Sequence, residues 1–287
     1  MLSPTPHAPL GANASFDFGP PDAPAGFALP ASVARTANVY VGCRPSAAEP
    51  WSLLPFFAPV AGGPPPLPKG RFGRFFAWAG DKWMIGPLVF KLCTPFDPAA
   101  TGDEAFAYAP VVCGYFEYDN THSADAAELV FGLGGRGAKL AVAGTVGFAF
   151  RGPLGFATAS SPEVSLRRDA AIFGADIGPA EALHFVVPPH ARRIYPLVLG
   201  FRQAGFFYST FFADLPSVLA YGLAHHARFL ALADARDAEF MRSTLDFATK
   251  NQLAHDTRVW LAQTRRLSGA APVDLTGLRD FARRVAG

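Results

Sequence analysis

The sequence predicts a mainly β protein, in which a large antiparallel β-sandwich (a supersandwich) is followed by a C-terminal α-helical linker. Two observations predict this class. All but two of the 27 prolines and all but four of the 28 glycines precede Asp214, and in that part many short apolar segments alternate with turn residues, as in antiparallel sandwiches. After Asp214, apolar residues recur at helical spacing. We therefore expect a β-sandwich domain at residues 1–213 and a helical linker at residues 214–287.

Short apolar or alternating segments predict the individual strands. In chain order they cover residues 38–42, 51–57, 88–92, 110–118, 128–133, 183–187 and 194–201. Pro55 interrupts the second segment, which favours the edge of a sheet because proline donates no hydrogen bond to a neighbouring strand. Turn residues at 119–122 and at 188–190 predict two hairpins, each joining the strands on either side of the turn.

The residues from Asp214 onward predict helices. The Asp214 carboxylate can cap a helix, and Pro216 suits its first turn. Apolar side chains then follow a helical stripe at Leu219, Leu223, Leu230, Leu253, Trp260 and Leu261. A break is expected near Asn251, and residues 268–272 end the pattern before a last short helix carrying Leu278, Phe281, Ala282 and Val285. Such stripes need a partner surface, because isolated helices gain little stability from them.

Composition and charge exclude several classes of protein. The chain has 287 residues, half of them hydrophobic, which is enough to bury a core. A formal net charge of +2 gives no electrostatic footprint for nucleic acid. No apolar run reaches the roughly 18 residues of a membrane helix, and the N-terminus lacks the basic and apolar regions of a signal peptide. We therefore expect a cytoplasmic protein without nucleic-acid or membrane partners.

Cysteines and histidines do not form a metal or disulfide pattern. Cys43, Cys93 and Cys113 are odd in number and far apart, which predicts buried free thiols rather than a disulfide framework or a metal knuckle. The seven histidines do not show metal-ligand spacing, and the adjacent His225 and His226 point in different directions on a helix. No metal or other cofactor is expected.

Two further patterns could carry chemistry, and each has a simpler interpretation. Residues 132–137 read G-L-G-G-R-G, which matches the dinucleotide fingerprint G-x-G-x-x-G, but that fingerprint needs a helix after the glycines. Residues 139–150 read as a strand, so we expect a glycine-rich β-turn. Glu117 and Asp119 share one face of a strand and could act as general acid and base; alternatively, Asp119 bonds the backbone of the turn that follows it.

Several stretches resemble glycoside hydrolase family 52, the β-xylosidases. Residues 7–19, H-A-P-L-G-A-N-A-S-F-D-F-G, resemble the N-terminus of that family. Four more stretches follow in the family's order: residues 38–42 with 53–56, residues 79–83, residues 109–112 leading to 118–121, and residues 207–212. The shared order is more specific than any single stretch, and it covers about residues 6–240.

The resemblance implies both a fold and an activity. It implies an N-terminal β-sandwich, a helical linker and a C-terminal (α/α)6 barrel, and retaining hydrolysis of β-xylosides by two carboxyl groups about 5–5.5 Å apart. Both catalytic carboxyl groups belong to the barrel, which is expected to lie outside this chain, so no catalytic residue is assigned. In the two-domain relatives the opening motif approaches the active-site rim, so His7, Ser15 and Phe16 are the candidate substrate-binding residues.

The function expected from the resemblance is that of the sandwich part of a β-xylosidase, not catalytic alone. The alternatives are a carbohydrate-binding or assembly module, and one half of a split glycosidase whose barrel comes from a separate chain. The expected ligand is xylose or a xylo-oligosaccharide, with sugar stacking on Trp51, Trp78 or Trp83 as one mode. Unburied helical stripes favour a barrel chain or self-association as partner. An enzyme with its own site at Glu117, Asp119 or a histidine ranks last.

Overall fold

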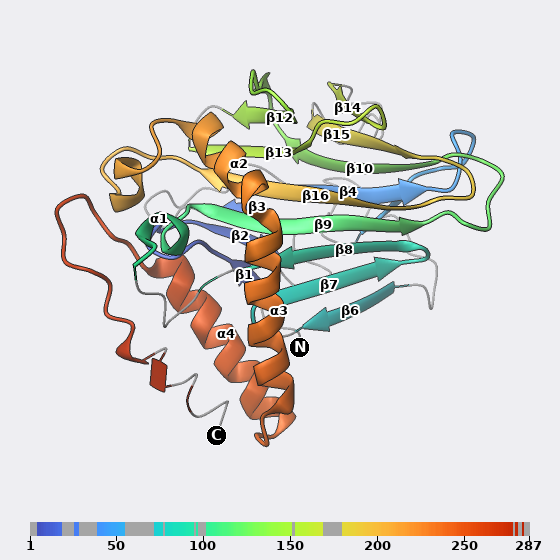
Figure 1. Cartoon of the computed structure of the whole chain (residues 1–287). Coiled ribbons are helices and arrows are strands. Elements are labelled where there is room, and N and C mark those ends of the chain that lie inside the picture. Colours follow the sequence, from blue (N-terminus) through green and yellow to red (C-terminus); the bar gives the residue numbers. More distant parts are fainter. Residues whose placement is uncertain are drawn as a thin grey trace.

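The structure confirms a mainly β protein followed by helices (Figure 1). It is a computed structural model that describes residues 5–18, 26–28, 39–54, 72–76, 78–94, 96, 102–150, 153–168, 180–277, 279–280 and 283. Within these residues, strands pair only in antiparallel fashion, in three sheets.

Two large sheets make the sandwich, and a small one closes an end. The eight-stranded sheet has the order β11 (Gly137–Lys139), β12 (Thr145–Phe150), β13 (Leu154–Ala159), β16 (Arg192–Phe201), β9 (Val111–Asp119), β8 (Leu88–Cys93), β7 (Gly80–Ile85) and β6 (Phe72–Phe76). The five-stranded sheet has the order β14 (Val164–Arg167), β15 (Ala180–Val187), β10 (Ala127–Gly134), β4 (Val39–Arg44) and β5 (Ser52–Leu53). The three-stranded sheet contains β1 (Thr5–His7), β2 (Ser15–Phe18) and β3 (Gly26–Ala28).

Phenylalanine rings fill the space between the two large sheets. Phe116 of β9 lies 6.1 Å from Phe131 of β10 and 5.4 Å from Phe185 of β15, measured between ring centroids. Phe131 also contacts Phe156 of β13 at 5.2 Å. All four rings are fully buried, so each adds hydrophobic burial and edge or offset ring contacts to the core.

The two hairpins predicted from the turns at 119–122 and 188–190 are wrong. Strand β9 lies in the eight-stranded sheet and β10 in the five-stranded sheet, and β15 and β16 are divided in the same way. Both connections therefore cross from one sheet to the other, because consecutive strands face each other across the core instead of pairing. Asn120 holds the two crossings together, since its side-chain amide donates to the carbonyl oxygens of Asp125 at 2.8 Å and Pro188 at 3.0 Å.

The glycine-rich segment 132–137 is a short bend between two sheets rather than the predicted β-turn: residues 132–134 end β10, and Gly137 begins β11 in the eight-stranded sheet. Gly135 takes a φ of 111° at this bend, a backbone conformation that L side chains rarely adopt. No helix opens at these glycines, since β11 follows directly. The geometry of a dinucleotide loop, with a phosphate at a helix N-terminus, is therefore not present here.

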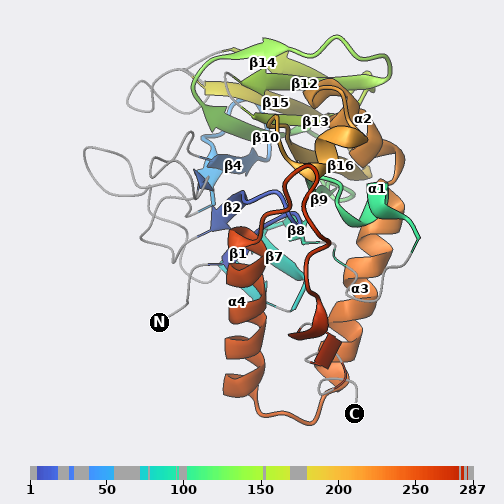
Figure 2. The same ribbon diagram turned by 90° about the vertical axis from the view of Figure 1, so that its left-hand side faces the viewer.

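Helices lie on the outer face of the eight-stranded sheet and at one end of the sandwich (Figures 1 and 2). They are α1 (Glu104–Ala107), the 3-10 turn η3 (Phe207–Thr210), α2 (Leu215–Ala224), α3 (His226–Arg242) and α4 (Phe247–Gln263). Asp214 caps α2 as predicted: its carboxylate accepts a hydrogen bond from the Ser217 amide at 2.8 Å. Among the described residues, no helix is both long and apolar enough to cross a membrane.

The break expected near Asn251 is wrong, because Asn251 lies inside α4. The chain breaks earlier, at residues 243–246, where Ser243 ends α3 and the Asp246 carboxylate caps α4 through the Thr249 amide at 3.0 Å. A local polar cap therefore sets the boundary between α3 and α4. The helical spacing of apolar residues does not show where that boundary lies. Of the predicted elements, residues 55–57 and most of the last short helix (278, 281, 282 and 285) lie outside the described residues.

Helix α2 approaches the sheet closely at Gly222. A Cβ at this position would lie 2.6 Å from Cγ1 of Val198 on β16. We expect Gly222→Ala to lower the free energy of unfolding by about 1–2 kcal/mol, because overpacking outweighs the gain in helix propensity. Gly277 is the matched control, since it is also helical but has nothing within 4 Å of a built Cβ. Urea unfolding of both variants measures the difference, and equal effects would contradict this packing.

Candidate functional site

Segments that are far apart in the sequence meet at one end of the sandwich, around the N-terminal strand and α4 (Figure 2). Backbone hydrogen bonds join them: the Asn13 amide donates to the Thr264 carbonyl at 2.9 Å, and the Arg266 amide donates to the Gly11 carbonyl at 2.9 Å. The Phe207 amide donates to the Arg266 carbonyl at 2.8 Å. We call this region, formed by residues 5–18, 78–81, 207–212 and 258–268, the junction.

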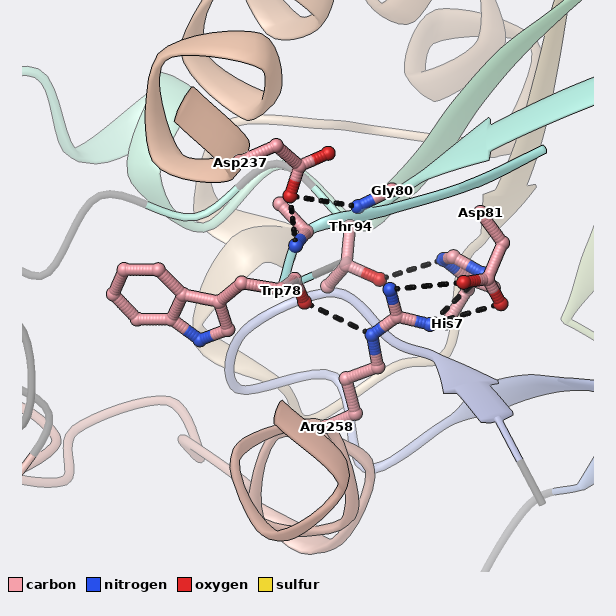
Figure 3. A network of polar contacts seen from close by, with 8 residues as sticks. His7, Trp78, Gly80, Asp81, Thr94, Asp237 and Arg258 are labelled. Carbon is pink, nitrogen blue, oxygen red and sulfur yellow. Dashed lines mark hydrogen bonds and ion pairs between the residues drawn. The ribbon is translucent and has the colours of Figure 1, made fainter. Parts of the chain in front are cut away.

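A buried ion pair lies at the centre of the junction (Figure 3). Nη1 of Arg258 lies 3.1 Å from Oδ2 of Asp81, and Nη2 lies 3.4 Å from Oδ1. Both side chains are 0% exposed. Nε of Arg258 donates to the Trp78 carbonyl at 3.0 Å, so the guanidinium has acceptors on two sides. A buried charge is tolerated only with such pairing and hydrogen bonding.

His7 joins the same network from β1. Its Nε2 lies 3.4 Å from Oδ2 of Asp81, and its Nδ1 lies 2.8 Å from Oγ1 of Thr94. The ring is fully buried, with Phe18 and Trp83 at edge-on distances of 6.1 and 6.3 Å. The network therefore connects β1, β7, the end of β8 and α4.

Local structure explains why these side chains meet. Asp81, Trp83 and Ile85 share the core-facing side of β7, because side chains alternate along a strand. On α4, Arg258 lies on the same face as Ala254 and Leu261, one helical turn away on either side, and all three are buried. An arginine within an apolar helical stripe was the available sequence signal for this site, and the sequence analysis missed it.

A second carboxylate, partly buried, attaches α3 to the start of β7. Oδ1 of Asp237 accepts hydrogen bonds from the amides of Ala79 at 2.6 Å and Gly80 at 3.3 Å. Burial raises the pKa of Asp237 to about 6, although those hydrogen bonds oppose the shift. One turn earlier, Asp234 pairs with Lys91 of β8. Gly80 is required here, since a Cβ would lie 2.8 Å from Oδ2 of Asp237.

The three predicted substrate-binding residues lie in the junction, but inside the protein. His7 belongs to the buried network, and Ser15 and Phe16 are 3% and 0% exposed in β2. The Phe16 ring packs 4.6 Å from Phe27. A sugar contact at these residues would need a change in the surrounding packing, and it stays a prediction.

Other candidate residues have structural partners. Glu117 pairs with Arg192 across β9 and β16. The Asp119 carboxylate accepts from the amide of Thr121 at 3.1 Å and from its hydroxyl at 2.6 Å, and these bonds lower the pKa of Asp119. This confirms the interpretation of Asp119 as a residue of the turn.

The histidine and cysteine predictions can also be compared with the structure. His226 contacts the Gly114 carbonyl at 2.6 Å, whereas the His225 ring stacks on Tyr221 at 4.0 Å. The three cysteines Cys43, Cys93 and Cys113 are buried free thiols, as predicted. In the described part of the chain, no group of three or more histidine, cysteine, aspartate or glutamate side chains could hold a metal ion.

Comparisons with known proteins identify a family and a relative that this chain resembles. A family model described as Glycosyl hydrolase family 52 matches residues 16–273. A β-xylosidase from Geobacillus stearothermophilus is 26% identical over 159 residues, which cover 44% of this chain and 26% of that enzyme. The alignment thus spans about a quarter of the length of the curated relative.

Removing the charge of Arg258 tests the ion pair. We expect Arg258→Ala to lower the free energy of unfolding by about 3–5 kcal/mol, because Asp81 would stay buried without its partner. Arg192→Ala is the control, since it breaks an arginine–glutamate pair whose arginine is 59% exposed, and exposed pairs contribute less than about 1 kcal/mol. Urea unfolding measures both; a loss at Arg258 no larger than the control would contradict the assigned pairing.

The raised pKa of Asp237 makes the free energy of unfolding depend on pH, and stability should fall as the pH rises. Its pKa is about 6 when folded, against an ordinary value of 3.8, so the folded state keeps this proton to higher pH than the unfolded state. Between about pH 4 and 6 the wild type should therefore lose up to about 3 kcal/mol relative to Asp237→Asn.

Chemical unfolding from pH 4 to pH 7 gives the difference curve between the wild type and Asp237→Asn. We expect the two proteins to have similar stability near pH 4, and the variant to be more stable at pH 7. Asp256→Asn, on the exposed side of α4, is the control. A flat difference curve for Asp237→Asn would show that Asp237 is not a buried acid.

Proposed function

The chain belongs to glycosyl hydrolase family 52, and we propose that it serves β-xyloside hydrolysis as the β-sandwich part of a glycosidase, without catalysing the reaction alone. The proposal divides the chain into a sandwich domain at residues 1–213 and a helical linker at residues 214–287. The catalytic carboxyl groups would come from a barrel that these residues do not include. The β-xylosidase name of the curated relative supports the substrate class.

The ion pairing of the carboxylates is the observation that supports this proposal. A retaining glycosidase needs two carboxyl groups about 5–5.5 Å apart, free to reach the sugar. In the described residues, ion pairs instead hold Asp81, Asp103, Glu104, Glu117, Glu128, Glu163, Glu181 and Asp234. A carboxylate paired with a guanidinium is a poor proton donor, because the cation stabilises its ionised form.

Asp237 differs from these eight carboxylates, since its raised pKa would suit a general acid. However, one of its oxygens accepts two backbone amide hydrogen bonds, from Ala79 just before β7 and from Gly80 at its start. A proton donor must reach the leaving oxygen of a substrate, whereas this carboxyl group lies between α3 and the sheet. Its geometry supports a role in attaching the helix.

A second candidate function is one half of a two-chain glycosidase, with the barrel on a separate chain. Exposed apolar side chains in the junction and where α3 meets α4 favour it, because such patches mark interaction sites. Phe211 is 42% exposed and Leu267 is 43% exposed. Met241 in the last turn of α3 is 67% exposed, and Phe247, the first residue of α4, is 78% exposed. Self-association through the same side chains is the competing explanation.

An assay with an aryl β-xyloside tests the proposal. The purified chain alone should show no turnover above the uncatalysed rate, because the proposal places both catalytic carboxyl groups on a barrel outside these residues. Co-expression with a polypeptide that supplies the part of the relative outside the alignment should restore turnover if the two-chain arrangement is right. Robust turnover by the chain alone, abolished by Asp237→Asn, would contradict the proposal and make Asp237 the acid.

A further inference from the structure

The outer face of the five-stranded sheet carries a cluster of polar side chains that the junction does not use. Arg44 of β4 lies directly opposite Glu128 of β10, and Ser165 of β14 lies opposite His184 of β15. Leu129 and Phe131, which alternate with Glu128 along β10, point into the core. The strands β4, β10, β15 and β14 lie in the upper part of Figure 1, away from α4.

Hydrogen bonds order this cluster. Oε2 of Glu128 accepts from Nη2 of Arg44 at 2.8 Å and lies 2.6 Å from Nε2 of His184. On the other side of the imidazole, Nδ1 lies 3.4 Å from Oγ of Ser165. Burial lowers the pKa of His184, and burial of Glu128 is outweighed by the hydrogen bonds from His184 and Arg44, which lower its pKa. At neutral pH the cluster therefore contains one guanidinium, one carboxylate and a neutral imidazole.

Trp51 lies over this cluster. The guanidinium carbon of Arg44 is 4.8 Å from the centre of the indole, and the His184 ring is 6.4 Å from it. Of the three tryptophans considered for sugar stacking, Trp78 and Trp83 are 0% and 1% exposed, whereas Trp51 is only partly buried. The structure thus leaves Trp51 as the one of these three rings that solvent reaches.

Two groups of the cluster can still form hydrogen bonds. Oε1 of Glu128 accepts no hydrogen bond from any described residue, in a side chain that is 13% exposed. The Ser165 side chain, on the far side of the His184 ring from Glu128, is exposed, and its hydroxyl can both donate and accept. A partly exposed aromatic ring in one cluster with an acceptor and a hydroxyl matches an extended ligand with an apolar face and several hydroxyl groups.

The charges of Arg44 and Glu128 favour a neutral ligand over a cationic or an anionic one. A cationic ligand on Trp51 would be repelled by the Arg44 guanidinium, which already lies against the ring. An anionic ligand would be repelled by the Glu128 carboxylate. A neutral polyhydroxylated ring avoids both repulsions.

From this arrangement we propose that the outer face of the five-stranded sheet carries a sugar-binding site centred on Trp51, which takes a neutral xylo-oligosaccharide; the choice of sugar rests on the function proposed above. The indole stacks on a sugar ring, Glu128 accepts from a hydroxyl group, and Ser165 bonds a second one. The site lies on the sandwich itself, so it needs no barrel.

Isothermal titration of the whole chain with xylotriose tests this site. The wild type should bind, and Trp51→Ala and Glu128→Gln should each weaken binding by about tenfold or more. Glu117→Gln is the matched control, because Glu117 is also a partly buried, arginine-paired glutamate, but on the eight-stranded sheet; it should bind like the wild type. Thermal unfolding of each variant shows that a loss of binding is not a loss of fold.

The other outcomes of the titration contradict the site, the argument from charge or the choice of sugar. Absence of binding of both xylotriose and cellotriose by the wild type, or equal binding by Trp51→Ala, overturns the site and leaves Arg44, Glu128 and His184 as a structural cluster. Binding of choline or glucuronate in place of xylotriose overturns the argument from charge. Binding of cellotriose but not xylotriose, still lost in Trp51→Ala, keeps the site and contradicts the β-xyloside assignment instead.

Discussion

The ion pair between Arg258 and Asp81 is the constraint on which the junction depends. Both groups are excluded from solvent, so moving α4 away from β7 would separate the two charges inside the protein or would open the core to water. A buried pair of this kind adds little net stability compared with apolar residues of similar size. What it does here is fix one position of α4 relative to β1 and β7, because its hydrogen bonds are satisfied only there.

This constraint changes how the helices after Asp214 are understood. Helix α2 packs on β16, α3 is attached to β7 through Asp237, and α4 is attached through Arg258. A partner chain or a further domain would therefore meet a surface made jointly by the sandwich and the helices. The exposed Phe211 and Leu267 belong to that joint surface, since the segments that carry them pair with each other at Phe206 and Leu267.

Patterns among neighbouring residues predicted the helix cap and most of the strands. They did not predict the contacts between residues that are far apart in the sequence. The Asp214 cap and the hydrogen bonds of Asp119 to Thr121 follow from the chemistry of a few neighbouring residues. Which strand pairs with which depends on the whole core, so the two hairpins were wrong although the strands were present. Arg258 and Asp81 are 177 residues apart, and no local pattern shows that they meet. Position 7 was singled out by resemblance, and the structure places it in that same network.

Native-state hydrogen exchange of the wild type tests this account most directly. If the ion pair joins the helix to the sandwich, the amides of residues 254–262 should become exposed together with those of β1 and β2. Their opening free energy should match that of the core strands β8 and β9, as expected for one cooperative unit. Exchange of residues 254–262 at a much lower free energy, while β1, β2, β8 and β9 stay protected, would contradict it.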